Sequence, residues 1–375
     1  MTSFYLRAVA GVQKLQPYIP GKPIDELERE YGVADAVKVA SNENPLGPSP
    51  KVTARLQQLL ARPAELARYP DGNGFVLKNK LADKLSLTNA QITLGNGSND
   101  VLELLARAFA GPDDEVIFSQ YAFAVYPIVT QAVGATAVIT EASDWGYDLN
   151  AILDAVSSKT RLIFIANPNN PTGTCIGAAQ LRTFINEVPE NVLIVVDEAY
   201  EEYASHPLSG FSDSYHSVLP WLDDYPNLVV TRTFSKAYGL AGLRVGFAVS
   251  SVEIAEILNR VRQPFNNNTF ALEAAAAALD DQHYLKQVVE LNWQGMQYLI
   301  ESFQQAGLKF IPSAGNFVCV QVGPNSAQIY ENLLYEGVIT RPVSNYQMPE
   351  HLRISIGTMD ENRSVVNALE KVFGQ

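Results

Sequence analysis

Short apolar runs alternate with segments of helical periodicity along the middle of the chain. The apolar runs are rich in Val, Ile and Leu and have the length of buried strands. We predict strands at residues 92–94, 115–119, 135–140, 161–166, 192–196, 228–231 and 246–250. Helices are predicted between them at residues 101–109, 124–132, 150–156 and 178–187. Repeated strand–helix units of this spacing predict an α/β fold with a doubly wound, mostly parallel sheet.

The two ends of the chain have other patterns. The N-terminal 40 residues are irregular and rich in proline, with two short helices predicted, the second at residues 24–31. Beyond residue 250, long helical segments precede short strands at 317–322 and 352–356, which predicts a smaller α+β domain. We therefore expect an N-terminal arm that joins the small domain, then a large domain, then the rest of the small domain, with boundaries 1–45, 46–265 and 266–375.

The net charge of the chain argues against some classes of binding partner. The chain has 27 Lys and Arg against 40 Asp and Glu, a formal net charge of -13, and no basic block. This argues against nucleic acid or an anionic membrane as the main partner. No signal peptide and no apolar run of membrane-spanning length is evident, so we expect a cytoplasmic protein. Cys175 and Cys319 are expected to be free thiols, and the four histidines lack ligand spacing, so no metal site is expected.

Polar loops follow four of the predicted strands, at residues 95–100, 167–173, 197–200 and 235–236. Ligands of open α/β sheets bind beyond the carboxyl ends of the strands. Because all four loops lie at such ends, we expect them to meet at one site.

Lys236 is the centre of the candidate chemistry. It follows a buried strand and is surrounded by small, hydroxylic and aromatic residues, which favour a neutral amine able to condense with an aldehyde. Thr233, Ser235 and Arg244 are close enough in sequence to bind an anion beside it. This combination suits a phosphorylated aldehyde, and pyridoxal phosphate is the common one. The alternative is a surface lysine beside a glycine turn.

A second phosphate-binding feature precedes the helix at 101–109. Gly95 and Gly97 allow close approach of a ligand, and Ser98, Asn99 and Asp100 are predicted to cap the helix, whose free N–H groups bind phosphate. A dinucleotide fingerprint requires a third glycine where Asp100 stands, which weakens a dehydrogenase interpretation.

The remaining candidates suit a planar, charged ring. Asp197 follows a buried strand and can keep a pyridine nitrogen protonated, and Tyr200 can reach a phenolic oxygen. Asn170 can donate to the same oxygen without adding charge, and Phe123 can stack on the ring. The alternatives are a strand-end acid that caps a loop, an ordinary turn, and a core phenylalanine.

In this order and spacing, Asn169 to Gly173, Asp197 to Tyr200, and Ser235-Lys236 with Arg244 resemble the fold-type I pyridoxal-phosphate aminotransferases. Within that group the chain resembles the histidinol-phosphate aminotransferases, from about residue 15 to its end. The segments that carry this second resemblance are residues 15–23, 41–50, 69–72 and 352–357.

The resemblance implies a role for each candidate. Lys236 is expected to be the Schiff-base lysine and proton shuttle, Asp197 to pair with the pyridine nitrogen, and Tyr200 to contact the phenolic oxygen with Asn170. Phe123 is expected to stack on the ring; relatives often have tyrosine at this position. The residues expected around the cofactor phosphate are Ser98, Asn99, Thr233, Ser235 and Arg244, joined by Tyr69 from the partner subunit of a homodimer.

On the substrate side, Arg353 is expected to pair with a carboxylate in a two-bonded fork. Tyr18, Arg341 and Asn42 are the further expected substrate contacts, the first two for a distal phosphate. The implied reaction is transamination between L-histidinol phosphate and 2-oxoglutarate. Three alternatives stay open: an aromatic or dual-specificity aminotransferase, a decarboxylase of a phosphorylated amino acid, and a regulatory module that binds the cofactor without catalysis.

Overall fold

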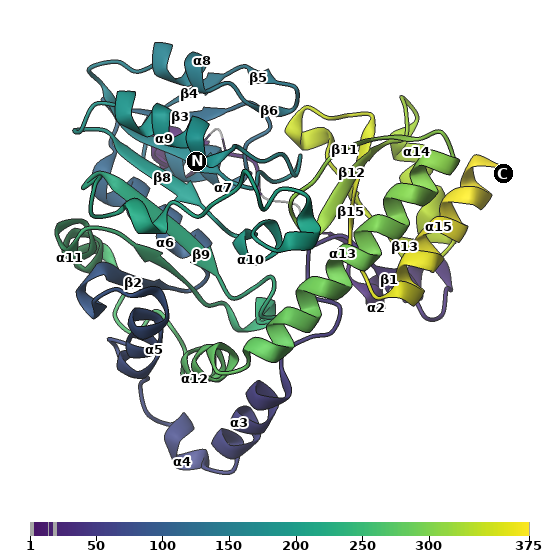
Figure 1. The fold of residues 1–375 in the computed structure, drawn as a ribbon, viewed down its shortest axis with the longest axis horizontal. Coiled ribbons are helices and arrows are strands. Elements are labelled where there is room, and N and C mark those ends of the chain that lie inside the picture. The colour runs from purple at the N-terminus through teal and green to yellow at the C-terminus, as the bar shows by residue number, and fades with distance from the viewer. Residues whose placement is uncertain (1–3, 14, 18–20, 375) are drawn as a thin grey trace.

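A seven-stranded sheet forms the largest part of the computed structural model, which describes residues 4–13, 15–17 and 21–374 (Figure 1). Its strands, in spatial order, are β2 (Ile92–Gly95), β10 (Gly246–Val249), β9 (Leu228–Thr233), β8 (Leu193–Asp197), β7 (Thr160–Ala166), β3 (Glu115–Ser119) and β4 (Thr136–Thr140). Within this sheet β10 runs antiparallel to both of its neighbours, and the other pairings are parallel. The α/β class and the mostly parallel sheet are confirmed.

Alternating residues of the central strands pack into two separate cores. Val116, Phe118 and their counterparts on the other strands contact one layer of helices, namely α6 (Ser98–Phe109), α7 (Val125–Ala132) and α11 (Val252–Val261). Ile117 and its counterparts point to the opposite layer, which contains α3 (Pro50–Leu60), α5 (Phe75–Leu85), α8 (Leu149–Asp154), α9 (Ala178–Glu187) and α12 (Thr269–Leu279). Continuous apolar strands are what a sheet covered on both faces requires.

The second unit is built on a four-stranded antiparallel sheet. Its spatial order is β11 (Lys309–Ile311), β12 (Phe317–Gln321), β15 (His351–Ser355) and β14 (Arg341–Pro342). The long helix α13 (Gln282–Gln305) runs from beside α12 to this sheet, where α14 (Ser326–Tyr335) and α15 (Met359–Phe373) also pack (Figure 1). This unit is the smaller α+β part that the sequence predicts.

The N-terminal segment joins the second unit through a short parallel pair. Strand β1 (Val37–Lys38) pairs with β13 (Val338–Ile339), and α2 (Ile24–Tyr31) packs against α14. Residues just after β1 are thereby held beside β15, since the N–H of Ser355 donates to the carbonyl of Val39. The polar loop at residues 41–50 thus starts at the small unit.

Short elements fill the connections. They are α1 (Ala10–Gln13), α4 (Pro63–Leu66), α10 (Glu201–Ala204), the hairpin of β5 (Ala142–Ser143) and β6 (Gly146–Tyr147), and the 3-10 turns at Phe4–Arg7, Asn89–Gln91, Pro207–Ser209, Leu219–Trp221, Ala241–Leu243 and Ser344–Tyr346.

The start of α6 lies earlier than the sequence predicts. The helix predicted from residue 101 begins at Ser98, with Gly97 before it at a φ of 85°, so Ser98 and Asn99 belong to its first turn. Glycine tolerates this backbone conformation and leaves the first N–H groups open. The domain boundary at 265/266 stays a prediction; α12, which it assigns to the small domain, packs on α3 and α5 in a core of the large sheet.

No helix in the described ranges combines the length and the apolar content that crossing a bilayer requires. Both cysteines are free; Cys319 is buried and Cys175 is half-buried.

Candidate active site

One cavity lies at the carboxyl ends of the central strands. The residues that line it come from the β2–α6 turn, the β3–α7 loop, and the ends of β7, β8 and β9 with the loop that follows. They are Ser98, Asn99, Phe123, Ala166, Pro168, Asn170, Asp197, Ala199, Tyr200, Thr233, Ser235, Lys236 and Arg244. Every residue predicted to touch the cofactor within one chain is in this set.

Lys236 is held at the wall of this cavity. Its Nζ donates to the carbonyl oxygen of Ser41 at 3.0 Å. The pKa of Lys236 is lowered from 10.5 to about 7, mainly by burial and then by the positive charge of Arg353, while the negative charge of Glu43 opposes the shift. The amine is therefore neutral, and nucleophilic, just above neutral pH.

Asp197 is the last residue of β8 and is 4 % exposed. Its Oδ1 accepts a hydrogen bond from Thr231 Oγ1 at 2.9 Å, and its Oδ2 accepts one from the hydroxyl of Tyr126 at 3.0 Å. Burial raises the pKa of Asp197 from 3.8 to about 6, and these two hydrogen bonds oppose that shift. The carboxylate is thus kept ionised at neutral pH although it is buried.

Tyr126 links two walls of the cavity, and sequence reasoning missed it. Its ring stacks on Phe164 at 4.8 Å and meets Phe123 edge to face at 5.9 Å. It lies in an apolar helical segment, where the sequence indicates only a core position. No local signal distinguishes its hydroxyl from that of a buried tyrosine with a backbone partner.

The hydroxyl of Tyr200 receives two donors. Asn42 Nδ2 donates to it at 2.9 Å and Asn170 Nδ2 at 3.1 Å. Burial raises the pKa of Tyr200 to about 12, so the hydroxyl stays protonated. Because both acceptor positions are occupied by the asparagines, its proton is left to point into the cavity.

Asn42 is buried and forms hydrogen bonds with two side chains of the protein. Besides its bond to Tyr200, its Oδ1 accepts from Ser355 Oγ at 2.9 Å, and it is 1 % exposed. The structure therefore shows Asn42 as a support for Tyr200, and its contact with substrate stays a prediction.

Arg353 connects the small sheet with this cavity. Its Nη1 donates to Asn170 Oδ1 at 2.6 Å and its Nη2 to the carbonyl of Ala40 at 2.7 Å, while the guanidinium lies 5.3 Å from the ring centre of Phe317. Its buried Nε has no partner among the described residues. The guanidinium is thus fixed by the protein and retains N–H groups for an anion.

Arg341 lies directly opposite Arg353 on the neighbouring strand β14. Directly opposed residues of an antiparallel pair project from the same face of the sheet. A Cβ placed on Gly21 would lie 4.0 Å from Arg341 Nη1 and 3.7 Å from Ser41 Oγ, so this guanidinium is close to the segment that holds Lys236. The two arginines therefore project from the same face of the small sheet, although Arg341 lines a different cavity from the one at Lys236.

The start of α6 and Arg244 form the other end of the cavity. Arg244 Nη1 donates to Ser235 Oγ at 3.4 Å and to the carbonyl of Ala241 at 3.0 Å. A Cβ on Gly97 would lie 2.4 Å from Arg244 Nη2, so the guanidinium packs against the turn before the helix. Backbone N–H groups, two hydroxyls and a guanidinium together make a site for a phosphate group.

Two predicted residues lie elsewhere. Tyr69 is 82 % exposed and stacks on Phe265 at 4.6 Å, outside the cavity of its own chain. Tyr18 lies outside the described residues.

The donor set fits pyridoxal phosphate. It contains a neutral amine for the aldehyde, an ionised acid for the ring nitrogen, a hydroxyl and an amide for the phenolic oxygen, an aromatic wall, and an anion site at a helix start. In the described part of the chain no group of three His, Cys, Asp or Glu side chains could hold a metal ion.

Comparisons with known proteins agree with this chemistry. A family model described as aminotransferase class I and II matches residues 34–369. Histidinol-phosphate aminotransferase 2 of Pseudomonas fluorescens (strain Pf0-1) is 55 % identical over 375 residues, 100 % of this chain and 99 % of the relative. Histidinol-phosphate aminotransferase 1 of Idiomarina loihiensis is 53 % identical over 364 residues, 97 % of each chain.

Solved structures share the fold. Histidinol-phosphate aminotransferase from Sinorhizobium meliloti, in complex with pyridoxal-5'-phosphate, superposes with a TM-score of 0.86 at 30 % identity and covers 98 % of both chains. Aspartate aminotransferase from Thermus thermophilus, with maleate, has a TM-score of 0.82 at 22 % identity over 96 % of this chain and 98 % of that one, a likeness of fold alone. The chain therefore belongs to the class I and II aminotransferases and, within them, to the histidinol-phosphate aminotransferases.

Proposed function

We propose that the chain is a pyridoxal-phosphate-dependent aminotransferase that moves the amino group of L-histidinol phosphate to 2-oxoglutarate, giving imidazole-acetol phosphate and L-glutamate. Full-length relatives carry the name of this activity, and the Sinorhizobium meliloti relative was solved with pyridoxal phosphate. The observation that carries the proposal within this chain is the convergence of Lys236, Asp197 and Tyr200 on one cavity. The reaction belongs to histidine biosynthesis, which we place in the cytoplasm.

Three side chains of the cavity have separate roles in the proposed reaction. When bound, pyridoxal phosphate supplies an aldehyde for the amino group and a ring that accepts the electrons of the broken Cα–H bond. Asp197 would hold the protonated ring nitrogen by accepting its hydrogen bond, and Tyr200 would donate its remaining proton to the phenolic oxygen. Lys236, with a pKa of about 7, would be suited to take a proton from the substrate Cα and to deliver it to the cofactor's former aldehyde carbon.

The two arginines explain how one site accepts two different substrates. L-Histidinol phosphate carries a phosphate ester where L-glutamate carries its α-carboxylate, and 2-oxoglutarate has a second carboxylate at its other end. Arg353 and Arg341 stand opposite each other on adjacent strands, so an anion bound by one has the second guanidinium nearby. We assign the α-carboxylate to Arg353 because its planar fork is already oriented by Asn170 and Ala40.

We further propose that the enzyme is a homodimer in which Tyr69 serves the neighbouring site. Tyr69 and Phe265 form an exposed aromatic stack, and the nearby residues Phe75 and Val76 at the start of α5 are also exposed. An exposed apolar area of this kind supports contact with a second copy. The hydroxyl of Tyr69 would then reach the phosphate end of the partner cavity.

The test is turnover by the purified protein supplied with pyridoxal phosphate. We expect L-glutamate to form only when L-histidinol phosphate and 2-oxoglutarate are both present, and Lys236→Ala to reduce the rate at least about a hundred-fold. Release of carbon dioxide from a phosphorylated amino acid, without 2-oxoglutarate, would identify a decarboxylase. A Lys236→Ala protein with the wild-type rate would refute the proposal.

A further inference from the structure

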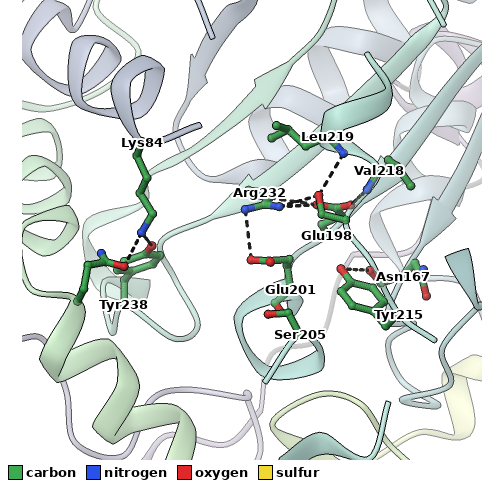
Figure 2. A network of polar contacts seen from close by, with 12 residues as sticks. Lys84, Asn167, Glu198, Glu201, Ser205, Tyr215, Val218, Leu219, Arg232 and Tyr238 are labelled. Carbon is green, nitrogen blue, oxygen red and sulfur yellow. Dashed lines mark hydrogen bonds and ion pairs between the residues drawn. The ribbon is translucent and has the colours of Figure 1, made fainter. Parts of the chain in front are cut away.

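A cluster of buried polar contacts joins β9 to the turn that follows β8 (Figure 2). Its centre is Arg232 of β9 with Glu198 and Glu201, none of which lines the cavity. The side chain of Glu198 is 1 % exposed and that of Arg232 is 12 % exposed. Charges this deep are costly unless they are fully paired. None of these three residues has a role in the proposed reaction.

Strand geometry places this cluster directly behind the catalytic residues. Asp197 and Thr231 are register partners on β8 and β9, and Thr231 donates to Asp197 on the cavity side. Successive residues of a strand point to opposite faces, so Glu198 and Arg232 project to the other side. The N–H of Glu198 still donates to the carbonyl of Thr231 at 2.9 Å, which extends the pairing of the strands by one residue.

The guanidinium of Arg232 uses all three of its nitrogens. Nε and Nη2 donate to Glu198 Oε2 at 3.1 Å and 2.8 Å, and Nη1 lies 3.2 Å from Glu201 Oε2. Nη2 also donates to Ser217 Oγ at 2.8 Å. The carboxylate of Glu198 also accepts hydrogen bonds from Ser217 Oγ at 2.7 Å and from the N–H of Val218 at 2.8 Å.

These contacts clamp a turn that carries two cofactor residues. Glu198 follows Asp197, and Glu201 follows Tyr200, which stands at the start of α10. The N–H of Glu201 donates to the carbonyl of Glu198, so the four residues form one tight turn. Arg232 joins both acids of this turn to β9, the strand that leads to Lys236.

We propose that Arg232 is a positioning residue of the cofactor site: by bridging Glu198 and Glu201 it fixes the turn that presents Asp197 and Tyr200. The planar guanidinium can hold two carboxylates and a hydroxyl at once. A lysine ammonium lacks this fork and is a single, flexible point charge. The inference rests on the proposed function, because it concerns the site that binds pyridoxal phosphate.

Neighbouring contacts support the same role for this face. Tyr238, two residues after Lys236, meets Lys84 Nζ through its hydroxyl at 3.3 Å (Figure 2). Tyr215 donates to the carbonyl of Asn167, where the loop that carries Asn170 begins. Each of these loops is thus held from the side away from the cavity.

The test measures how well the cofactor-free protein binds pyridoxal phosphate and how the bound cofactor is oriented. Arg232→Lys and Arg232→Gln are compared with wild type by the dissociation constant and by visible circular dichroism at saturating cofactor. We expect the dissociation constant to rise about ten-fold and the circular dichroism per bound cofactor to fall. Arg232→Lys should recover at most part of the difference between Arg232→Gln and wild type. Glu201→Gln, which keeps the shape of a half-buried side chain, is the milder variant if the arginine variants do not fold.

The matched control is Arg161→Gln. Arg161 Nε pairs with Asp114 at 2.9 Å at the opposite end of the same sheet, so the variant removes an arginine ion pair without touching the turn. We expect its dissociation constant and circular dichroism to stay at wild-type values. If the Arg232 and Glu201 variants lower the melting temperature but keep both cofactor readouts, the proposal is wrong. If wild type itself does not bind pyridoxal phosphate, the proposed function fails instead.

Discussion

Lys236 and Asp197 must be in opposite charge states for transamination, the amine neutral and the carboxylate ionised. Burial disfavours the charged form of both groups, so it helps Lys236 and works against Asp197. The hydrogen bonds from Thr231 and Tyr126 oppose the effect of burial on Asp197 by stabilising its ionised form. With pKa values of about 7 and about 6, both requirements are met above neutral pH.

The first prediction concerns the pH dependence of cofactor capture. Because the protonated amine cannot attack an aldehyde, the rate at which cofactor-free protein binds pyridoxal phosphate should rise with pH around a midpoint near 7 rather than 10.5. Arg353→Met removes a positive neighbour of Lys236, so its pKa and the midpoint should move upward. Stopped-flow absorbance across the neutral range measures both. A rate that is independent of pH would contradict this assignment.

The second prediction concerns the partner of Asp197. Tyr126→Phe keeps the stack on Phe164 but removes one hydrogen bond to the carboxylate, so the pKa of Asp197 should rise further. We expect affinity for pyridoxal phosphate to fall about ten-fold at neutral pH, with a larger loss on the acidic side, as judged by equilibrium titration. Tyr225→Phe removes the hydroxyl bonded to Asn186 far from the cavity and is the control. Equal affinities for the two variants would show that Tyr126 is only a core residue.

At this scale the sequence predicted the groups that touch the cofactor better than those that support them. Lys236 and Asp197 follow predicted buried strands and have neighbours that indicate cofactor chemistry. Local sequence is therefore enough to predict that they contact the cofactor. Tyr126 and Asn42 act through bonds to residues 71 and 158 positions away. Nothing local in the sequence specifies such partners.

At the scale of elements, the loop from β9 to β10 determines where Lys236 lies. Gly239 has a φ of 70°, and a Cβ there would lie 2.4 Å from the carbonyl oxygen of Gly47. The loop therefore packs tightly on the segment at residues 41–50, whose Ser41 accepts from Lys236. Gly242, three residues later in the same loop, has a φ outside the left-handed region and open space around it.

The third prediction compares these two glycines. Gly239→Ala should strain the backbone by about 1–2 kcal/mol and also push the loop away from Gly47, so it should lower the melting temperature and weaken cofactor binding. Gly242→Ala should leave both near wild type. Differential scanning fluorimetry with and without pyridoxal phosphate measures the two effects. Equal behaviour of the two variants would mean that the close approach at Gly239 does not matter for the site.

The predicted elements were most accurate where one pattern decided them. The helices at Ile24–Tyr31 and Ala178–Glu187 agree with prediction in both bounds, since each has a clear apolar stripe. The hairpin of β5 and β6 was missed because its turn uses Asp144 and Trp145 at positive φ and contains no Asn-Gly signal. Helix α15 was missed although Thr358 and Glu361 form a capping box at its start.

At the scale of the molecule, the site is assembled from both sheets and from the N-terminal segment. Lys236 belongs to the large sheet, Arg353 to the small one, and Ser41 and Asn42 to the loop between them. The sequence predicted that these residues act together only through resemblance to a family. Hydrophobic pattern alone places each on its element and leaves the distances between the units undetermined.

The fourth prediction tests the proposed dimer through shared sites. Lys236→Ala and Tyr69→Ala proteins should each be nearly inactive, but a dissociated and reassembled mixture should regain about one quarter of wild-type activity. Half of the dimers are then mixed, and one of the two sites in each mixed dimer has both an intact Lys236 and a partner's intact Tyr69. Reassembly of each variant alone is the control. No recovery in the mixture, with dimers present, would mean that Tyr69 does not cross the interface.

The most direct test of the central claim is a half-reaction of the purified protein loaded with pyridoxal phosphate. L-Histidinol phosphate and L-phenylalanine are added separately, at equal concentration and without 2-oxoglutarate, and the visible absorbance of the cofactor is followed. We predict rapid conversion with L-histidinol phosphate, much slower conversion with L-phenylalanine, and none in Lys236→Ala. Comparable rates with the two donors, or no change with L-histidinol phosphate, would contradict the account.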